Sequence, residues 1–449
     1  MSTNHHVTAA AARHIELEDR YGAHNYHPLP VVLSEGRGCY VWDVDGKRYF
    51  DFLSAYSAVN QGHCHPRIVG KLEEQSRRLT LTSRAFHNDQ LGEYERYLTE
   101  YFGFDKVLPM NTGAEGVETA IKLCRKWGYV KKGIPADQAR IIVCGQNFHG
   151  RTTTIISFSS DPDAKGQFGP YTPGFESVPY GDVAAMEAAL ASDPDTIAGV
   201  LVEPIQGEAG VFVPEDGYLE AVRAACTRYN VLFIADEIQT GVARTGALLR
   251  VCGDCTCAGH CERQPTTYVR PDILILGKAL SGGVYPVSAV LADDPIMEVI
   301  QPGQHGSTFG GNPVACAVAR EALEVVRDEK LTQNARVLGH LFRAEMQQLV
   351  EQYPDLLVLV RGKGLLNALV INDSPDSKTA WNLCLALADA GLLAKPTHGN
   401  IIRFAPPLVI TEEQLREACG IIKEVVSQAV KQSNSQAVEQ SSSSQTVKQ

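Results

Sequence analysis

The sequence lacks the features that would direct the chain to a membrane, to secretion or to nucleic acid. No apolar stretch reaches the roughly 18 residues that cross a bilayer, and no apolar core of a secretory signal is present. The chain has 41 Lys and Arg against 52 Asp and Glu, and its net charge of -11 disfavours phosphate backbones and anionic lipids. We therefore expect no membrane partner and no nucleic-acid partner.

The N-terminus also lacks the pattern of a mitochondrial presequence. Arg13 and Arg20 are basic, but Glu16, Glu18 and Asp19 put acidic charge into the same stretch. Presequences are rich in arginine and poor in acidic residues. We therefore expect a cytoplasmic protein.

A disulfide framework is missing as well, because 12 cysteines are spread over 449 residues. Most cysteines stand alone in apolar surroundings and are expected in the core. Examples are Cys124, Cys144, Cys316 and Cys384. In the segment CGDCTCAGHCERQ at 252–264, His260 lies among four clustered cysteines: Cys252, Cys255, Cys257 and Cys261. We interpret it as a surface insertion with no catalytic role and assign no metal ligand. Redox-responsive thiols and a zinc site remain alternatives.

Short apolar runs alternate with helical patterns through the middle of the chain. Runs without polar alternation are typical of strands that are buried on both faces of a mostly parallel sheet. They lie at residues 107–110, 141–144, 199–202, 231–235, 273–276 and 287–291. Helices are expected between them, for example at 115–129 and 183–191. The alternation predicts a doubly wound α/β domain.

The length of the chain exceeds one ordinary core, so we expect more than one lobe. We divide it into an N-terminal segment, a large α/β domain, a smaller α+β domain and a disordered tail, at residues 1–60, 61–310, 311–426 and 427–449. The N-terminal segment contains a hairpin pattern around Asp45-Gly46 and is expected to pack on the smaller domain. The tail is rich in Ser, Gln and Lys and buries too little apolar area to offset its ordering entropy.

An acid and a lysine follow two of the predicted strands. Asp236 ends the run VLFIAD, and Lys278 follows DILILG. Ligands of open α/β sheets bind beyond the carboxyl ends of the strands, so these side chains could face one pocket. Taken alone, Asp236 is more simply explained as an acidic residue in a turn, and Lys278 as a charged residue on the surface. Together, a reactive lysine and a carboxylate that needs a positive partner suit pyridoxal phosphate, with its protonated pyridine nitrogen.

Two glycine-containing segments could hold a phosphate. MNTGAEGVETAIKL places Gly113 at the start of a helix, where free N–H groups bind anions, although an ordinary helix start explains it about equally well. HGSTFGGNP offers the hydroxyls of Ser307 and Thr308. Phe148 follows a strand and could stack on a pyridine ring, while the adjacent His149 receives no role.

At this point the motifs resemble those of a known family. EPIQGEAG at 203–210, DEIQTGVARTG at 236–246, LGKALSGG at 276–283 and HGSTFGGNP at 305–313 resemble the class III aminotransferases of fold type I. Within that class, four further segments resemble the ornithine aminotransferases: AHNYHPLP at 23–30, AYSAVNQGHCHP at 55–66, LTSRAFHN at 81–88 and LLAKPTHGNIIRFAPPL at 392–408. The resemblance covers about residues 15–426.

The resemblance implies the α/β fold of type I pyridoxal-phosphate transferases and a pyridoxal 5′-phosphate cofactor. Lys278 is similar to the lysine that binds this cofactor as a Schiff base and shuttles a proton during transfer. Asp236 would pair with the pyridine nitrogen and Gln239 with the ring hydroxyl. Phe148 would stack on the ring.

The resemblance also implies a homodimer with active sites at the interface. Gly113 and Ala114 would give backbone N–H groups to the phosphate, and Thr308 would reach it from the partner subunit. One departure from the usual pattern is His149, which stands where a larger aromatic residue is common. We expect this change to be tolerated.

Substrate choice would rest on five residues. Tyr26 and Arg151 resemble those that hold the α-amino and α-carboxylate groups of ornithine. Arg403 resembles the residue that receives the α-carboxylate of glutamate or 2-oxoglutarate, and Glu208 would pair with it while ornithine reacts. Tyr56 would separate ornithine users from γ-aminobutyrate users.

The expected activity is transfer of the δ-amino group of L-ornithine to 2-oxoglutarate by a ping-pong cycle. The products would be glutamate 5-semialdehyde and glutamate. Another class III aminotransferase, acting on acetylornithine or γ-aminobutyrate, is an alternative that Tyr26 and Tyr56 disfavour. A non-catalytic scaffold that binds the cofactor is a third interpretation.

Overall fold

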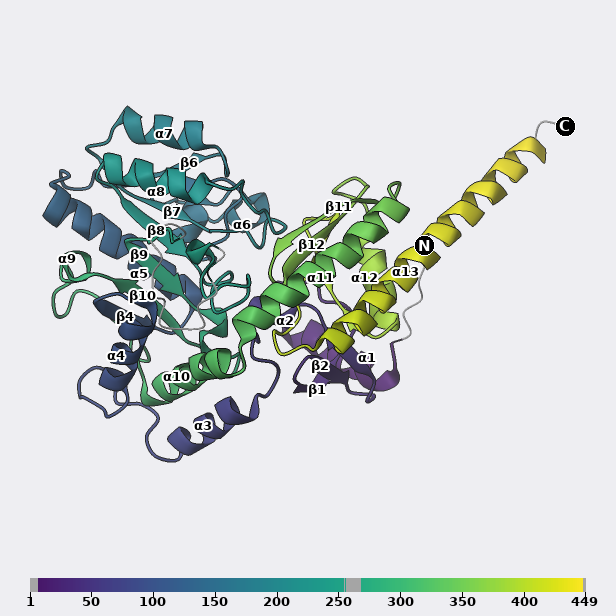
Figure 1. Cartoon of the computed structure of the whole chain (residues 1–449), viewed down its shortest axis with the longest axis horizontal. Coiled ribbons are helices and arrows are strands. Elements are labelled where there is room, and N and C mark those ends of the chain that lie inside the picture. Colours follow the sequence, from purple (N-terminus) through teal and green to yellow (C-terminus); the bar gives the residue numbers. More distant parts are fainter. Residues whose placement is uncertain (1–6, 254, 256–267, 447–449) are drawn as a thin grey trace.

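The computed structural model describes residues 7–253, 255 and 268–446, which form two bodies packed against one another (Figure 1). One body contains a seven-stranded sheet, and the other contains two four-stranded sheets. Strands β4 to β10 all lie in the first body, and the division near residues 60 and 310 stays a prediction. Within the described ranges, no helix is both long enough and apolar enough to cross a membrane.

The large sheet has the strand order β4-β10-β9-β8-β7-β5-β6. Its strands are β4 (Lys106–Met110), β5 (Arg140–Cys144), β6 (Phe175–Val178), β7 (Ile197–Val202), β8 (Leu232–Asp236), β9 (Ile273–Leu276) and β10 (Ser288–Ala292). The pairs from β9 to β6 are parallel, whereas β10 runs antiparallel to both β9 and β4. The mostly parallel sheet and all the strands predicted from apolar runs are confirmed. Strand β6 was not predicted, because it is a short edge strand whose residues FESV include a glutamate.

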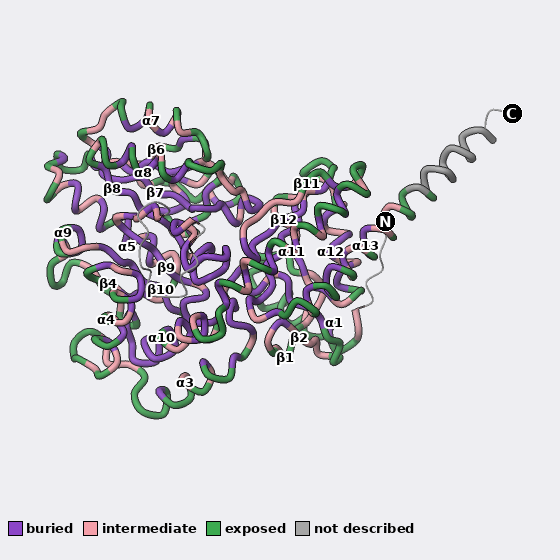
Figure 2. The backbone as a smooth tube through the Cα atoms, viewed as in Figure 1, coloured by how far each residue is buried: buried purple, intermediate pink, exposed green. Residues whose placement is uncertain are grey.

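Alternate residues of the large sheet pack into separate hydrophobic clusters on its two faces. In β5, Ile141 and Val143 belong to one cluster, and Ile142 and Cys144 belong to the other. Helix α5 (Gly113–Trp127) contributes to the first cluster, and α8 (Tyr218–Arg228) to the second. Figure 2 shows the strands buried between these layers. Covering both faces explains why consecutive strand residues are apolar.

The remaining helices of this body pack around the sheet. They are α3 (Pro66–Ser76), α4 (Leu91–Phe102), α6 (Pro162–Lys165), α7 (Val183–Ser192) and α9 (Asp294–Met297). Short helical turns are η1 (Gly128–Lys132), η2 (Ile155–Phe158), η3 (Arg250–Cys252) and η4 (Lys278–Ser281). The helices expected at 115–129 and 183–191 correspond to α5 and α7 within a few residues.

The second body combines the N-terminal and C-terminal parts of the chain. One sheet has the order β1-β2-β3-β13 and the other β11-β12-β15-β14. The strands are β1 (Leu33–Arg37), β2 (Tyr40–Asp43), β3 (Arg48–Asp51), β11 (Leu357–Lys363), β12 (Leu366–Ile371), β13 (Leu392–Leu393), β14 (Lys395–Thr397) and β15 (Ile401–Phe404). The helices are α1 (Ala9–Tyr21), α2 (Ser54–Ser57), α11 (Leu331–Gln352), α12 (Thr379–Asp389) and α13 (Glu412–Thr446). Helix α10 (Pro313–Asp328) instead packs on α3, α4 and η4 of the large body (Figure 1). The predicted hairpin is confirmed as β2 paired with β3.

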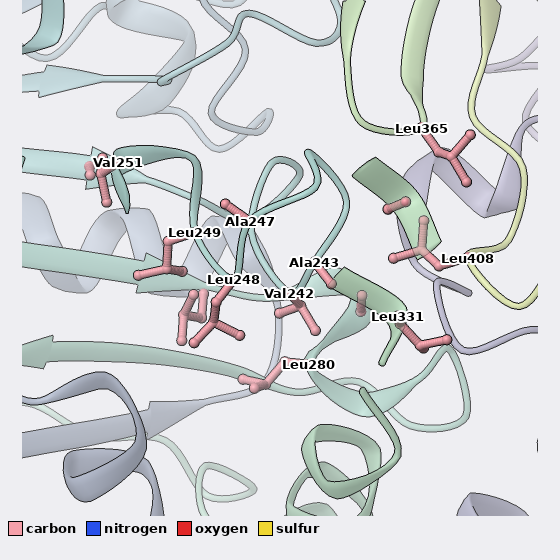
Figure 3. Packing of buried hydrophobic residues seen from close by; sticks show 14 of the residues in the cluster. Val242, Ala243, Ala247, Leu248, Leu249, Val251, Leu280, Leu331, Leu365 and Leu408 are labelled. Atoms are coloured by element: carbon pink, nitrogen blue, oxygen red, sulfur yellow. The ribbon is translucent and has the colours of Figure 1, made fainter. Parts of the chain in front are cut away.

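A continuous hydrophobic cluster joins the two bodies (Figure 3). It contains Val242 and Leu248 from the loop after β8, Leu331 from the start of α11, and Leu365 and Leu408 from the second body. The loop after β8 is therefore fixed by packing on both sides. This loop follows Asp236, so the packing also holds one wall of the site described below.

The tail differs from the sequence-based expectation. Helix α13 continues to Thr446 and extends away from the body in Figure 1, although we expected residues 427–449 to be disordered. The beginning of α13 packs on α11 and α12, which provides a nucleus from which a helix can extend at little further cost. Composition alone does not reveal such a nucleus.

The cysteines expected in the core are buried: Cys124, Cys144, Cys316 and Cys384. Cys252 is buried as well, at the end of η3. Cys257, His260 and Cys261 lie outside the described residues. The interpretations of the cysteine-rich insertion therefore stay predictions.

Candidate active site

Asp236 and Lys278 lie at the carboxyl ends of the neighbouring strands β8 and β9, as predicted. Asp236 is the last residue of β8 and pairs with Ile275 of β9, while Lys278 follows β9 and begins η4. Lys278 has a φ of 44°, a conformation that costs free energy for residues other than glycine and often marks a functional site. Both side chains line one cavity of about 140 Å³.

The same cavity gathers several of the other predicted residues. These are Gly113, Ala114, Phe148, Glu208 and Gln239. It is also lined by residues to which we assigned no role, above all His149 and Glu203. The site therefore contains more ionisable groups than the motifs suggested.

The amine of Lys278 is poised to lose its proton. Burial lowers the pKa of Lys278, and the positive charge of Arg403 lowers it further. The carboxylates of Glu208 and Asp236 act in the opposite direction, but burial prevails. A lysine must be uncharged to attack a carbonyl, so this environment suits a nucleophilic amine.

His149 is a direct partner of Asp236. Its Nδ1 lies 2.6 Å from Oδ2 of Asp236, and the two residues are only 3% and 4% exposed. Burial alone would lower the pKa of His149, but the hydrogen bond to Asp236 and its negative charge raise the pKa above the ordinary value. The contact with Asp236 therefore favours the protonated form of the His149 imidazole. The only signal in the sequence was the position of His149 next to Phe148.

Glu203 is a second buried carboxyl group, directly after β7. Its Oε2 accepts the backbone N–H of Phe148 at 3.0 Å, which ties the segment carrying Phe148 and His149 to the sheet. Burial raises the pKa of Glu203 to about 8, although the charge of His149 opposes this. Glu203 follows a buried strand just as Asp236 does, so the same reasoning could have found it.

The start of α5 offers N–H groups to an anion. The hydroxyl of Thr112 accepts the N–H of Glu115 at 3.2 Å, and the carboxylate of Glu115 accepts the N–H groups of Asn111 and Thr112. This capping box leaves the N–H groups of Gly113 and Ala114 without an acceptor among the described residues. Both residues line the cavity, so this helix end could hold a phosphate.

Glu208, whose side chain is 23% exposed, forms an ion pair with the buried Arg403 at another side of the cavity. Nη1 of Arg403 lies 2.7 Å from Oε1 of Glu208, and Arg403 is 3% exposed. Burial would raise the pKa of Glu208, but Arg403, Lys278 and the hydrogen bonds of the pair lower it to about 2. The same Oε1 accepts Nε2 of Gln239 at 2.9 Å, and the Arg403 guanidinium stacks 4.8 Å from the ring centre of Tyr56. The pair anticipated from the sequence is thus present.

Some predicted residues lie away from the cavity. Tyr26 is 69% exposed and lines a separate cavity of about 500 Å³ together with Tyr56. Arg151 is exposed, with its guanidinium carbon 5.9 Å from the ring centre of Phe148. Ser307 accepts Nδ2 of Asn111 at 2.8 Å, and Thr308 is exposed. A role for Thr308 in the partner subunit stays a prediction.

Comparison with known proteins identifies the family. The profile of class III aminotransferases matches residues 21–426. The chain belongs to this family. This class III aminotransferase is 60% identical to the mitochondrial ornithine aminotransferase of Drosophila melanogaster. The alignment spans 424 residues and covers 94% of each of the two chains. The chain is 57% identical to the enzyme of Rattus norvegicus, over 92% of this chain and 89% of that one.

Solved structures of class III aminotransferases have the same fold. The ornithine aminotransferase of Toxoplasma gondii superposes with a TM-score of 0.88 at 47% identity, covering 94% of this chain and 96% of that one. The acetylornithine aminotransferase of Elizabethkingia anophelis superposes with a TM-score of 0.85 at 62% identity, covering 94% and 100%. The predicted fold type is confirmed.

Class III aminotransferases depend on pyridoxal phosphate, and the residues of the cavity fit this group. The Asp236 carboxylate suits a protonated pyridine nitrogen, and the N–H groups of Gly113 and Ala114 suit a phosphate. Oε1 of Gln239 is buried without a partner among the described residues, and it can accept a ring hydroxyl. Lys278 would hold the cofactor covalently.

Proposed function

We propose that the chain is an ornithine aminotransferase, which transfers the δ-amino group of L-ornithine to 2-oxoglutarate with glutamate 5-semialdehyde and glutamate as products. The observation that carries this proposal is the ion pair of Glu208 with the buried Arg403. An enzyme that accepts ornithine by its δ-amino group and glutamate by its α-amino group must hide the arginine that binds the glutamate α-carboxylate while ornithine reacts. A carboxylate paired with that arginine does this.

When bound, the cofactor supplies the aldehyde that carries the amino group and the ring that stabilises negative charge on the reacting carbon. The chain supplies the rest. Nζ of Lys278, whose pKa is lowered by burial, takes up the proton released from that carbon and returns it. The Asp236–His149 pair keeps negative charge at the far end of the ring, and Phe148 shields one ring face. Tyr26 and Arg151 hold the α-groups of ornithine.

The assembly and location proposed here are a homodimer in the cytoplasm. Ser307 and Thr308 lie in an exposed loop, suited to reaching the cofactor phosphate of a partner subunit. The fly and rat relatives carry the word mitochondrial in their names, so the location is the part of this proposal that most needs its own test. Fractionation of cells that produce the protein would test the location.

Acetylornithine aminotransferase is the second candidate, because a structure of that enzyme is 62% identical to this chain. The unmodified α-amino group of ornithine distinguishes the two donors. Tyr26, at the edge of the 500 Å³ cavity, has a hydroxyl that suits a free amine better than an acetamide. Substrate preference therefore has to be measured directly.

A spectral titration tests the proposal. The purified protein should be yellow, and ornithine should bleach its visible absorbance, with acetylornithine and γ-aminobutyrate much less effective. 2-Oxoglutarate should then restore the colour. Tyr56→Ile should lower the preference for ornithine over γ-aminobutyrate by about tenfold, since one lost polar contact is worth that much. A protein that responds to acetylornithine more readily than to ornithine would overturn the proposal.

A further inference from the structure

The turn that carries Tyr56 has an unusual backbone. All residues from Ser54 to Ser57 are left-handed, with φ values of 51°, 47°, 59° and 69°, and none of them is glycine. Left-handed conformations are costly for residues with a side chain and persist only where the surrounding structure fixes them. Something must therefore hold this turn in place.

Asp51 holds the beginning of the turn. Its Oδ1 accepts the backbone N–H groups of Leu53 at 2.8 Å and Ser54 at 2.9 Å. Its own N–H donates to the carbonyl of Cys39 at 2.9 Å, which fixes its backbone in the sheet. Asp51 is 7% exposed, so these bonds are shielded from water.

His63 completes the arrangement from another part of the chain. Its Nε2 lies 2.7 Å from Oδ2 of Asp51. Its backbone exchanges two hydrogen bonds with Gly38, and a Cβ at Gly36 would approach its ring to 2.9 Å. The ring is therefore wedged in place and fixes the direction of the Asp51 carboxylate.

The other end of the turn reaches the active site. The carbonyl of Tyr56 accepts Nε2 of Gln239 at 3.3 Å, and its ring lies under the guanidinium of Arg403. Gln239 and Arg403 both bond to Glu208. A continuous series of contacts thus leads from His63 and Asp51 to the residues proposed to select the substrate. Asp51, His63 and Tyr56 also line the same 500 Å³ cavity as Tyr26.

We propose that Asp51 and His63 are positioning residues that set the place of Tyr56 and thereby the selection of the amino donor. This inference rests on the proposed ornithine aminotransferase activity. Neither side chain lines the cavity that contains Lys278. Their removal should therefore change which donor is preferred, while the cofactor environment stays as it is.

The test compares two histidines that make the same kind of contact. His63→Ala removes the partner of Asp51. His65→Ala is the matched control, because Nε2 of His65 lies 2.9 Å from Glu329 and the pair has no contact with Tyr56. We expect His63→Ala to lower kcat/KM for ornithine relative to γ-aminobutyrate by about tenfold, mainly through KM, as for loss of one positioned polar contact. His65→Ala should leave that ratio unchanged, even if it lowers the melting temperature.

A conservative substitution separates positioning from general damage. In His63→Gln, the amide nitrogen can take the place of Nε2, so the ratio should return toward that of the unmodified enzyme. The visible absorbance of the bound cofactor should be the same in all three variants. If His63→Ala does not fold, Asp51→Asn takes its place, since it keeps the shape and should show the same loss of preference.

The outcomes distinguish this inference from the proposed function. If the unmodified enzyme does not respond to ornithine, the proposed function fails. If it does respond and the donor ratio of the His63→Ala or Asp51→Asn variant equals that of His65→Ala, the positioning role is overturned. A changed ratio that His63→Gln does not restore would overturn it as well.

Discussion

Glu203 is a neutral buried acid in the middle of a charged site, and its ionisation should affect stability. Burial raises the folded-state pKa to about 8 from an ordinary value of 4.5. Unfolding therefore releases a proton from Glu203 between these pH values. The stabilising contribution of neutral Glu203 to the free energy of unfolding is full below pH 4.5 and is lost as the pH rises through 8. Glu203→Gln keeps an acceptor for the N–H of Phe148 but cannot ionise.

The melting temperature of Glu203→Gln relative to that of the unmodified protein should rise by about 2–4 °C between acidic and mildly alkaline pH. In a chain of 449 residues 1 kcal/mol shifts the melting temperature by about 1 °C, so this rise corresponds to about 2–4 kcal/mol. Thermal unfolding near both ends of that range, at equal cofactor loading, measures the difference. Glu413→Gln, which changes an exposed carboxyl group, is the control and should show a constant difference. A difference for Glu203→Gln that is equally constant would contradict the assignment.

Single residues were predictable where the sequence places chemistry at a strand end. Asp236 and Lys278 followed from that position, because the carboxyl ends of parallel strands meet at one edge. The contact between His149 and Asp236 was not predictable, since it joins residues 87 positions apart by side-chain direction alone. The exposure of Arg151 and the separate cavity beside Tyr26 likewise depend on tertiary packing.

At the scale of one element, the beginning of α5 is expected to control cofactor affinity. A Cβ at Gly113 would lie 3.1 Å from Cδ1 of Ile238, in the segment between Asp236 and Gln239. Gly113→Ala should therefore displace that segment and weaken cofactor binding by about tenfold, equivalent to the loss of one good contact. Titrating the cofactor-free protein with pyridoxal phosphate measures the dissociation constant.

The matched control is Gly92→Ala in α4, where an added Cβ meets nothing within 4 Å. It should leave the affinity unchanged, although it lies in the first turn of a helix as Gly113 does. Equal affinities for the two variants would show that the α5 terminus does not control the site.

Elements with strong periodic patterns were predicted almost to their ends, and weaker ones were not. Helix α5 was expected at 115–129 and spans Gly113–Trp127, because its apolar positions repeat at helical spacing over several turns. The edge strand β6 is short and partly exposed, so it has no apolar run to mark it. The left-handed turn Ser54–Ser57 has no signature in the sequence, since none of its residues is the glycine that such a backbone favours.

At the scale of the whole molecule, the candidate site draws on both bodies. Lys278 and Asp236 belong to the large sheet, Arg403 to β15, and Tyr56 to the N-terminal segment. Glu208 bonds to Arg403 and so joins the two bodies inside the site. We therefore expect substrate selection to depend on how the two bodies pack, and the proposed cofactor contacts to come mostly from the large body.

The proposed dimer can be tested by combining two different subunits in one dimer. If Thr308 serves the site of the partner subunit, two defective subunits should complement one another. Pairing a Lys278→Ala subunit with a Thr308→Ala subunit leaves one site that has both Lys278 and Thr308 intact. Co-expression with two different tags and purification of the mixed dimer should therefore give about half of the unmodified activity at limiting cofactor, one intact site of two.

If Thr308 instead serves its own chain, both sites of the mixed dimer carry a defect. Its activity at limiting cofactor would then not exceed half that of the Thr308→Ala dimer. A mixed dimer of Lys278→Ala with an unmodified subunit is the control, because it has one intact Lys278 in either arrangement. Its activity sets the value that the complemented dimer should reach if the exposed loop containing Ser307 and Thr308 crosses the interface.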